Sequence, residues 1–267
     1  MQKKLVIIKL GGSVITDKSK SIPTPRLENI NNLSSEISDL YKLGKYKFIL
    51  VHGAGSYGHP IAKMHSLYLG MKTVKQKMAF SKINQAMLDL NKIIMQNLIK
   101  KDLPVINFIP HTFIIQTAGK FTGMQIKSIN QCLINNQIPV LYGDCVLDSK
   151  WGCSILSGDT IVSYLAQKLG ANKVIFMSDV NGIYDSDPKQ NPQAKLIRQI
   201  NNKNLAKVLT GLTSYNKFDV TGEMKGKILK IKKDLRSIEV NIINGLNKNN
   251  LKKIMQQNQI GTRLQFD

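Results

Sequence analysis

The sequence is poor in cysteine, and what little there is excludes two classes of protein. Among 267 residues there are three cysteines, Cys132, Cys145 and Cys153, which form no CxxC pair and show no metal-ligand spacing. A disulfide-stapled scaffold and a structural metal centre are therefore not expected. Cys145 and Cys153 bracket an expected hairpin and could face each other across it. We expect all three to be reduced thiols.

Long hydrophobic runs are also missing. No apolar stretch approaches the roughly 20 residues that a membrane span requires. The first expected strand begins about five residues into the chain, which leaves no room for a signal peptide. A cytoplasmic location is therefore the default expectation. The hydrophobic content of 42% and the length fit a globular protein, either one large α/β domain or two closely fused lobes.

Acidic residues are scarce as well, with 38 Lys+Arg against 17 Asp+Glu and a formal charge of +21. Such an excess could attract nucleic acid, an anionic surface or anionic metabolites. However, the basic residues are nearly all lysine and are scattered along the chain. Only 6% of residues are aromatic, and no basic–aromatic pattern indicates base stacking. Most of the charge is expected to be solvated surface.

Short apolar runs alternate with segments of helical period, which predicts a layered α/β fold. Several runs are rich in Val, Ile and Leu without alternation, as in a parallel sheet covered on both faces. The expected strands are Leu5–Leu10, Phe48–Val51, Val105–Phe108, Ile138–Leu141, Lys173–Met177, Glu239–Ile243 and Thr262–Leu264. The expected helices are Arg26–Leu43, Ile61–Leu69, Val74–Lys101, Met124–Asn135, Asp159–Leu169, Asn201–Leu209, Gly222–Leu235 and Lys248–Gln257. Thr112–Thr122 and Cys145–Ser154 resemble hairpins, and a lobe boundary is expected near residues 165–172.

Two glycine-rich turns, each after a buried strand, carry the strongest functional signal. In the first, Lys9 ends a strand directly before Gly11, Gly12 and Ser13. A lysine at the carboxyl edge of the sheet lies where open α/β folds bind ligands, and glycine lets backbone N–H groups approach an anion. The pattern indicates phosphate binding, although an ordinary tight turn with a surface lysine would look the same.

The second turn, His52–Pro60, contains GAGSYG, which matches a dinucleotide-binding fingerprint. That interpretation fails because no strand ending in an acidic residue follows about 20 positions later. What remains is an anion-binding loop flanked by two histidines. His52 has the position of a structural histidine. His59 is expected at the entrance to a helix, where it could hydrogen-bond a phosphate and carry charge near neutral pH.

Three later segments add charged groups near the same sheet edge. Ile155–Thr160 leads into an apolar helix, and Asp159 could either cap that helix or hold neighbouring lysines in place. Ser178–Pro188 is a loop with three aspartates, which suggests contacts to ribose, adenine or the water shell of a magnesium ion. Asp219–Lys227 reads as a helix start whose lysines oppose the helix dipole unless an anion lies nearby. No Walker A motif, protein-kinase signature, Ser-His-Asp signature or HExxH motif occurs.

Taken in order, these motifs resemble the amino acid kinase family over essentially the whole chain. The matching segments are KLGGS with TDK (Thr16–Lys18), HGAGSYGHP, GDCV, LSGDTIVSYLA, SDVNGIYDSDP and DVTGEMKGK. Within the family, the histidine after the third glycine resembles the branch that phosphorylates isopentenyl monophosphate in isoprenoid biosynthesis. The resemblance implies an open αβα sandwich around a mainly parallel sheet. It also implies an acceptor lobe over residues 1–170, an ATP lobe over residues 171–267, and a homodimer.

Site roles follow from the resemblance motif by motif. The implied catalytic residues are Lys9, Lys18, His59, Asp159 and Lys227. The implied acceptor-binding residues are Gly53, Ala54, His59 and Gly158. The implied ATP-binding residues are Lys9, Gly11, Gly12, Ser13, Gly55, Asp179, Gly182, Gly222, Lys225 and Lys227. Relatives often read DVTGGM where this chain has Glu223, which places a carboxylate near the expected phosphates.

The resemblance implies in-line transfer of the ATP γ-phosphoryl group, with Mg²⁺ bound to the nucleotide and no metal-ligating residue assigned. The acceptor is already ionised, so positioning and charge neutralisation would carry the catalysis. An apolar pocket would hold the isoprenoid tail, with side chains such as Ile83 and Met87 available. Two alternatives stay open: a kinase of another small phosphate or phosphonate of the fosfomycin type, and a nucleic-acid-binding protein that kept a kinase fold.

Overall fold

The computed structural model describes the chain apart from residues 1–2, 21, 187, 189–190, 215–220 and 267. Its described part contains a main sheet of eight strands in the order β3-β5-β2-β1-β8-β10-β11-β9. Neighbouring strands are parallel except β10 and β11. The bounds are β1 Lys4–Leu10, β2 Tyr46–His52, β3 Val105–Asn107, β5 Ile138–Tyr142, β8 Lys173–Ser178, β9 Gln199–Ile200, β10 Glu239–Asn244 and β11 Thr262–Leu264.

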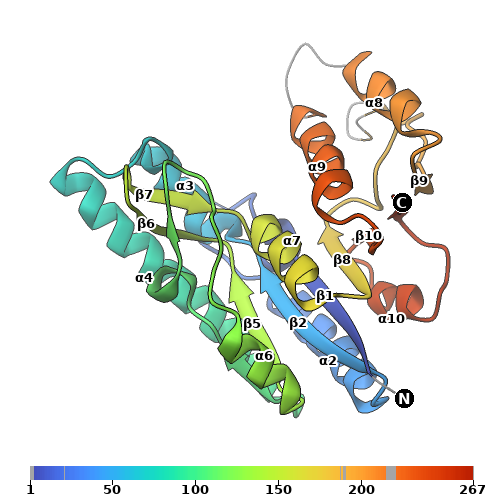
Figure 1. Cartoon of the computed structure of the whole chain (residues 1–267), viewed down its shortest axis with the longest axis horizontal. Helices are drawn as coiled ribbons and strands as arrows, with labels where there is room; N and C mark the ends of the chain where they lie inside the picture. The colour runs from blue at the N-terminus through green and yellow to red at the C-terminus, as the bar shows by residue number, and fades with distance from the viewer. Residues whose placement is uncertain (1–2, 21, 187, 189–190, 215–220, 267) are drawn as a thin grey trace.

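Helices cover both faces of this sheet, which makes an αβα sandwich and confirms the expected fold class (Figure 1). On one face lie α1 Gly12–Ile15, α2 Leu27–Lys42, α3 Gly55–Met64, α4 Val74–Ile99 and α10 Asn250–Met255. On the other lie α6 Lys127–Ile134, α7 Gly158–Leu169, α8 Leu205–Ser214 and α9 Thr221–Asp234. Along β1, Val6 and Ile8 face the first layer while Leu5 and Ile7 face the second, so the continuous apolar runs reflect burial on both sides.

A smaller sheet, in the order β4-β6-β7, stands beside the main one. Strands β6 (Asp144–Asp148) and β7 (Gly152–Leu156) form the expected hairpin. The hairpin expected at Thr112–Thr122 is much shorter than predicted: it is reduced to one antiparallel bridge between Thr117 and Lys120 around a two-residue turn. This segment holds the end of a short helix, α5 Pro110–Phe113, and one strand, β4 Ile115–Gln116, which pairs parallel with β6. The buried free thiols of Cys145 and Cys153 lie diagonally across the hairpin, because Cys145 pairs with Ile155 and Cys153 with Leu147.

Most expected helices occur within a few residues of their expected bounds, but the second glycine turn differs. There α3 begins at Gly55, six residues earlier than expected, and runs through Pro60 to Met64. A separate 3₁₀ turn, η1, follows at Leu67–Leu69. His59 therefore lies inside the helix, not at its entrance. No helix in the described part of the chain is long and apolar enough to cross a membrane.

The sheet core makes a direct stability prediction. Phe48 is fully buried at the centre of β2, and truncation of a buried phenylalanine costs about 3–5 kcal/mol. We expect Phe48→Ala to lower the free energy of unfolding by that amount in urea denaturation. Leu43, an exposed side chain just before β2, provides the control: Leu43→Ala should change the free energy by less than about 0.5 kcal/mol. Equal effects of the two substitutions would contradict the assigned core.

Candidate active site

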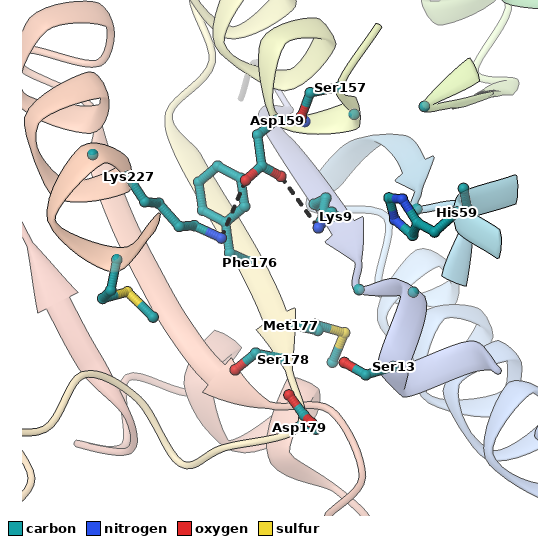
Figure 2. A pocket seen from close by; sticks show the side chains of 18 of the residues that line it. Lys9, Ser13, His59, Ser157, Asp159, Phe176, Met177, Ser178, Asp179 and Lys227 are labelled. Carbon is teal, nitrogen blue, oxygen red and sulfur yellow. Dashed lines mark hydrogen bonds and ion pairs between the residues drawn. The ribbon is translucent and has the colours of Figure 1, made fainter. Parts of the chain in front are cut away.

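One cavity of about 660 Å³ lies at the carboxyl ends of β1, β2 and β8. Its lining includes most of the expected site residues: Lys9, Gly11, Gly12, Ser13, Lys18, Gly53, Ala54, His59, Gly158, Asp159, Asp179, Gly182 and Lys227. Figure 2 shows His59 and Ser13 on one side, Lys227 on the other, and Lys9 with Asp159 between them. Segments from both halves of the chain thus line one continuous space.

Asp159 joins the two lysines at the middle of the cavity. One carboxylate oxygen, Oδ1, lies 3.2 Å from Nζ of Lys9, and the other, Oδ2, lies 3.3 Å from Nζ of Lys227. Burial opposes ionisation of Asp159, but the two ammonium groups outweigh it and lower the pKa of the carboxyl to about 2. The carboxylate is therefore charged at all physiological pH values. It holds two cations from β1 and α9 in one place.

The carboxylate of Asp159 can contact both lysines because it does not cap its own helix. Ser157 caps α7, because its hydroxyl accepts a hydrogen bond from the backbone N–H of Asp159 at 3.2 Å. Asp159 is thus not the N-cap, which was one interpretation of the sequence. It is the second residue of α7, which begins at Gly158. Lys227 is further held over the ring of Phe176, 4.4 Å from its centroid. The motif offered Ser157 as a second candidate cap, since serine is a preferred N-cap residue, but the ring contact had no signal in the sequence.

The two glycine turns touch each other through bare backbone. A side chain at Gly12 would place its Cβ 2.5 Å from the nitrogen of Gly55, and one at Gly53 would come within 2.8 Å of the nitrogen of Gly12. Gly55 also has a positive φ of 52°. The hydroxyl of Thr16, which is fully buried, connects the turns: it donates to the carbonyl of Gly12 and accepts from the N–H of Ser56. The glycines therefore serve loop–loop packing as well as access to the cavity.

The end of the cavity beside α3 and α4, which we call the acceptor end because the family resemblance predicts acceptor binding there, combines polar turns with apolar walls. His59 is exposed and projects from α3, and Lys18 is exposed on the segment after α1. Gly158 packs against the carbonyl of His52 and lies close to Gly143, so the start of α7 reaches the same edge. Ala62, Ile83 and Met87 supply an apolar wall from α3 and α4. The arrangement suits a molecule with an anionic head and a hydrocarbon tail.

His52 has a structural role, as its position in the sequence suggested. It is 1% exposed, stacks on Tyr142 with ring centroids 5.0 Å apart, and lies 3.2 Å from Oδ1 of Asn91. Burial lowers its pKa to about 4, despite hydrogen bonds to Gly53 and Asn91 that favour the charged form. The imidazole is therefore neutral near pH 7, and its hydrogen bond to Gly53 supports the second glycine turn.

At the opposite end, the loop after β8 and helix α9 line the cavity. Asp179 is exposed on this loop. Gly182 has a φ of 145° and packs closely against Thr262, whose hydroxyl accepts from the N–H of Ile183 at 2.8 Å. Lys225, an expected ATP ligand, is not among the residues that line the cavity, whereas Lys227 is.

Some expected residues of the last motif cannot be placed at this end. The backbone of Gly222 and Glu223 belongs to α9, but their side-chain surroundings lie outside the described residues. Asp219, from the same motif, and Asp187, from the loop after β8, also lie outside the described residues.

The sequence reading missed a buried polar cluster beside the acceptor end. The side chain of Asp144, which closes the turn after β5, is fully buried, and its Oδ2 lies 2.6 Å from Nδ1 of His111. The amide of Asn84 and the N–H of Cys145 also donate to Asp144, at 3.2 and 2.8 Å. Burial raises the pKa of this carboxyl, although its partners favour the charged form. The cluster ties α4 and α5 to the start of β6, and only the motif GDCV pointed toward it.

The buried imidazole predicts a pH dependence of stability. Because the pKa of His52 falls from about 6.5 in the unfolded chain to about 4 in the folded one, the unfolded state binds more protons between these values. The free energy of unfolding should therefore fall by up to about 3 kcal/mol as the pH drops from 6.5 to 4. His52→Gln should lose this part of the slope in denaturation measured across the range. Superimposable pH profiles for the two proteins would contradict the assignment.

Comparisons with known proteins identify the family of this chain. The family model described as "Amino acid kinase family" matches residues 4–244. The isopentenyl phosphate kinase of Methanocaldococcus jannaschii is 35% identical over 271 residues, covering 98% of this chain and 99% of the relative. That of Methanothermobacter thermautotrophicus is 31% identical, covering 97% and 98%.

Solved structures are similar over the same length. One described as "X-ray structures of isopentenyl phosphate kinase" is 28% identical with a TM-score of 0.83, covering 97% of this chain and 99% of its own. An isopentenyl phosphate kinase substrate complex is 28% identical with a TM-score of 0.77, covering 98% and 99%. With a family model over most of its length and relatives above 30% identity over nearly all of it, the chain belongs to the amino acid kinase family.

Proposed function

We propose that this protein transfers the γ-phosphoryl group of ATP to isopentenyl monophosphate and releases isopentenyl diphosphate and ADP. The observation that carries the proposal is the Lys9–Asp159–Lys227 cluster at the middle of a single cavity. On one side of it lie the glycine turns and an apolar wall, and on the other the loop after β8 and α9. Full-length similarity to isopentenyl phosphate kinases supports this choice of acceptor.

The lysines act on the phosphoryl group in transit. With Asp159 holding both ammonium groups, Lys9 and Lys227 face the place where negative charge develops between donor and acceptor. The acceptor phosphate is already ionised, so no strong general base is needed. Lys18, exposed at the same cavity, adds positive charge. Catalysis then rests on alignment and on charge stabilisation.

The acceptor phosphate binds at the second glycine turn. Gly53, Ala54 and Gly158 offer backbone at the cavity wall, and His59 presents its imidazole there (Figure 2). The hydrocarbon tail extends along Ile83 and Met87, on the inner face of α4. This division of polar and apolar lining fits an isoprenoid monophosphate better than a compact polar phosphonate.

The nucleotide binds on the side of the second half of the chain, residues 171–267. Gly11, Gly12 and Ser13 face the phosphates, while Asp179, Gly182 and Lys227 line the nucleotide end. In the described part of the chain, no group of three or more His, Cys, Asp or Glu could hold a metal ion. Mg²⁺ would therefore be held mainly by triphosphate oxygens and water, with Asp179 available to its water shell, and would neutralise phosphate charge. The proposal includes a homodimer, as the family resemblance implies.

The direct test is ADP release measured with a panel of acceptors. Isopentenyl monophosphate should exceed a fosfomycin-type phosphonate by orders of magnitude in kcat/KM. The reverse ranking would favour the alternative kinase. ATP-independent, salt-sensitive RNA binding without any ADP release would instead favour the nucleic-acid-binding alternative.

Substitution of the central lysines makes a sharper prediction. Lys9→Ala and Lys227→Ala should each lower kcat by about 10²–10³, because each removes a donor aimed at developing charge. Lys225→Ala is the matched control: it removes the same charge from α9 at a position outside the cavity lining. It should leave kcat within about threefold. Similar losses at Lys225 and Lys227 would contradict the assignment.

His59 makes a separate prediction on the acceptor side. His59→Ala should lower kcat/KM for isopentenyl monophosphate by about 10²–10³, since it removes a hydrogen-bond donor to the phosphate. The KM for ATP should change little. A loss expressed mainly in the KM for ATP would place His59 on the nucleotide instead.

A further inference from the structure

An unusual surface lies on the outer side of the acceptor end, between α3 and the first turns of α4. Large apolar side chains crowd a short stretch of sequence there: Met64, Tyr68, Leu69, Val74 and Met78 are between 55% and 77% exposed. Such exposures are ordinary for single residues, but these five occur within 15 positions, on three elements (α3, η1 and α4) that contact one another, and we treat them as one patch. We call it the basic apolar patch, because lysines surround it.

The lysines are Lys63, Lys72, Lys75, Lys77 and Lys82, all exposed. No aspartate or glutamate occurs between Asp39 and Asp89, so this stretch carries uncompensated positive charge. Among the described residues, none of the five lysines forms an ion pair. The segment from Met64 to Lys82 therefore combines exposed hydrocarbon with cations and contains no acidic residue.

Helix geometry arranges these groups as a stripe with flanks. At about 100° per residue, Val74 and Met78 lie about 40° apart on α4. Lys77 flanks this apolar stripe on one side, and Lys75 and Lys82 flank it on the other. The first carboxylate on the helix, Asp89, lies roughly 16 Å beyond Met78 along the helix axis. The start of α4 is thus an amphipathic helical end with a basic border, the pattern of helices that lie at a lipid surface.

Adjacent segments are tied to this end of α4. The side-chain amide of Gln76 donates to the carbonyl of His65 at 3.3 Å, which fixes the end of α3 beside α4. The N–H of Met71 donates to the carbonyl of Trp151 at 2.7 Å, which attaches the tip of the β6–β7 hairpin. Trp151 is 41% exposed and is the only tryptophan in the chain. Its backbone lies beside Gly70 and Met71, while its indole ring packs against Gly119.

We propose that the basic apolar patch binds the surface of an anionic phospholipid bilayer. Charge complementarity selects this partner: lysines attract anionic head groups, while Met64, Leu69 and Met78 enter the boundary with the acyl chains. The inner face of α4, opposite the stripe, carries Ile83 and Met87 of the cavity wall. The bilayer-bound protein thus has its acceptor end close to the lipid. The binding itself requires no turnover, so it stands or fails separately from the proposed reaction.

The test uses the full chain and vesicles of phosphatidylcholine with or without about a third phosphatidylglycerol. The protein should float with anionic vesicles at physiological salt and not with neutral ones. The triple variant Lys72→Gln, Lys75→Gln, Lys77→Gln should bind at least tenfold more weakly, since each lysine near an anionic surface contributes about fivefold. Its matched control, Lys42→Gln, Lys45→Gln, Lys100→Gln, removes the same charge from exposed positions elsewhere and should bind as the parent does.

The apolar contribution has its own pair of variants. Met64→Ser, Leu69→Ser, Met78→Ser should bind at least tenfold more weakly. The control Leu43→Ser, Ile99→Ser, Ile134→Ser changes three apolar residues that are also more than half exposed, and it should bind as the parent does. Thermal unfolding and ADP release in solution verify that all four triple variants are folded. Four results would overturn the proposal: no flotation with anionic vesicles, equal losses in patch and control variants, patch-dependent RNA binding without vesicle binding, or loss of self-association in the patch variants without vesicle binding. The last would identify a second copy of the chain as the partner.

Discussion

The site depends on one arrangement of charge, a carboxylate between two ammonium groups. Lys9 and Lys227 come from opposite halves of the chain, and without Asp159 their ammonium groups would repel each other across the cavity. Asp159 offsets that repulsion because it is ionised at every physiological pH and contacts both. It also keeps part of their positive field available, since one negative charge faces two positive ones. The cluster can therefore form before any substrate arrives.

This arrangement requires that the backbone segments around it approach closely. The turns after β1 and β2 touch at Gly12, Gly53 and Gly55, where any side chain would collide with neighbouring backbone. Thr16 then fastens the contact with two hydrogen bonds. The sequence predicted these glycines as an anion cradle, which stays a prediction; the structure adds a packing role that the sequence did not predict. Their packing holds the two turns together beside Lys9.

What the sequence predicted well depends on local patterns. Buried parallel strands such as β1 and β8 appear in the sequence as unbroken apolar runs. The glycines beside Lys9 and Asp159 drew attention to these two residues, and both line the cavity. What it missed depends on tertiary contact. The sequence around Gly55 resembles a loop, yet α3 begins there. The N–H of Ser56, in the first turn of this helix, donates to the hydroxyl of Thr16, a contact with a distant turn that the local sequence does not predict. The Asp144–His111 pair joins residues 33 positions apart, and no local pattern announces it.

The long helix α4 shows how one element can serve two environments. Its buried face contributes Ile83 and Met87 to the cavity, and Asn84 to the Asp144 cluster. In its first turns, Val74 and Met78 are exposed to solvent between lysines and do not belong to the buried core. The chain's lysine excess is therefore not uniform in its consequences. Where lysines are scattered over polar surface, they favour solubility. Where they border exposed hydrocarbon, in a segment with no acidic residue, they favour an anionic, amphiphilic partner.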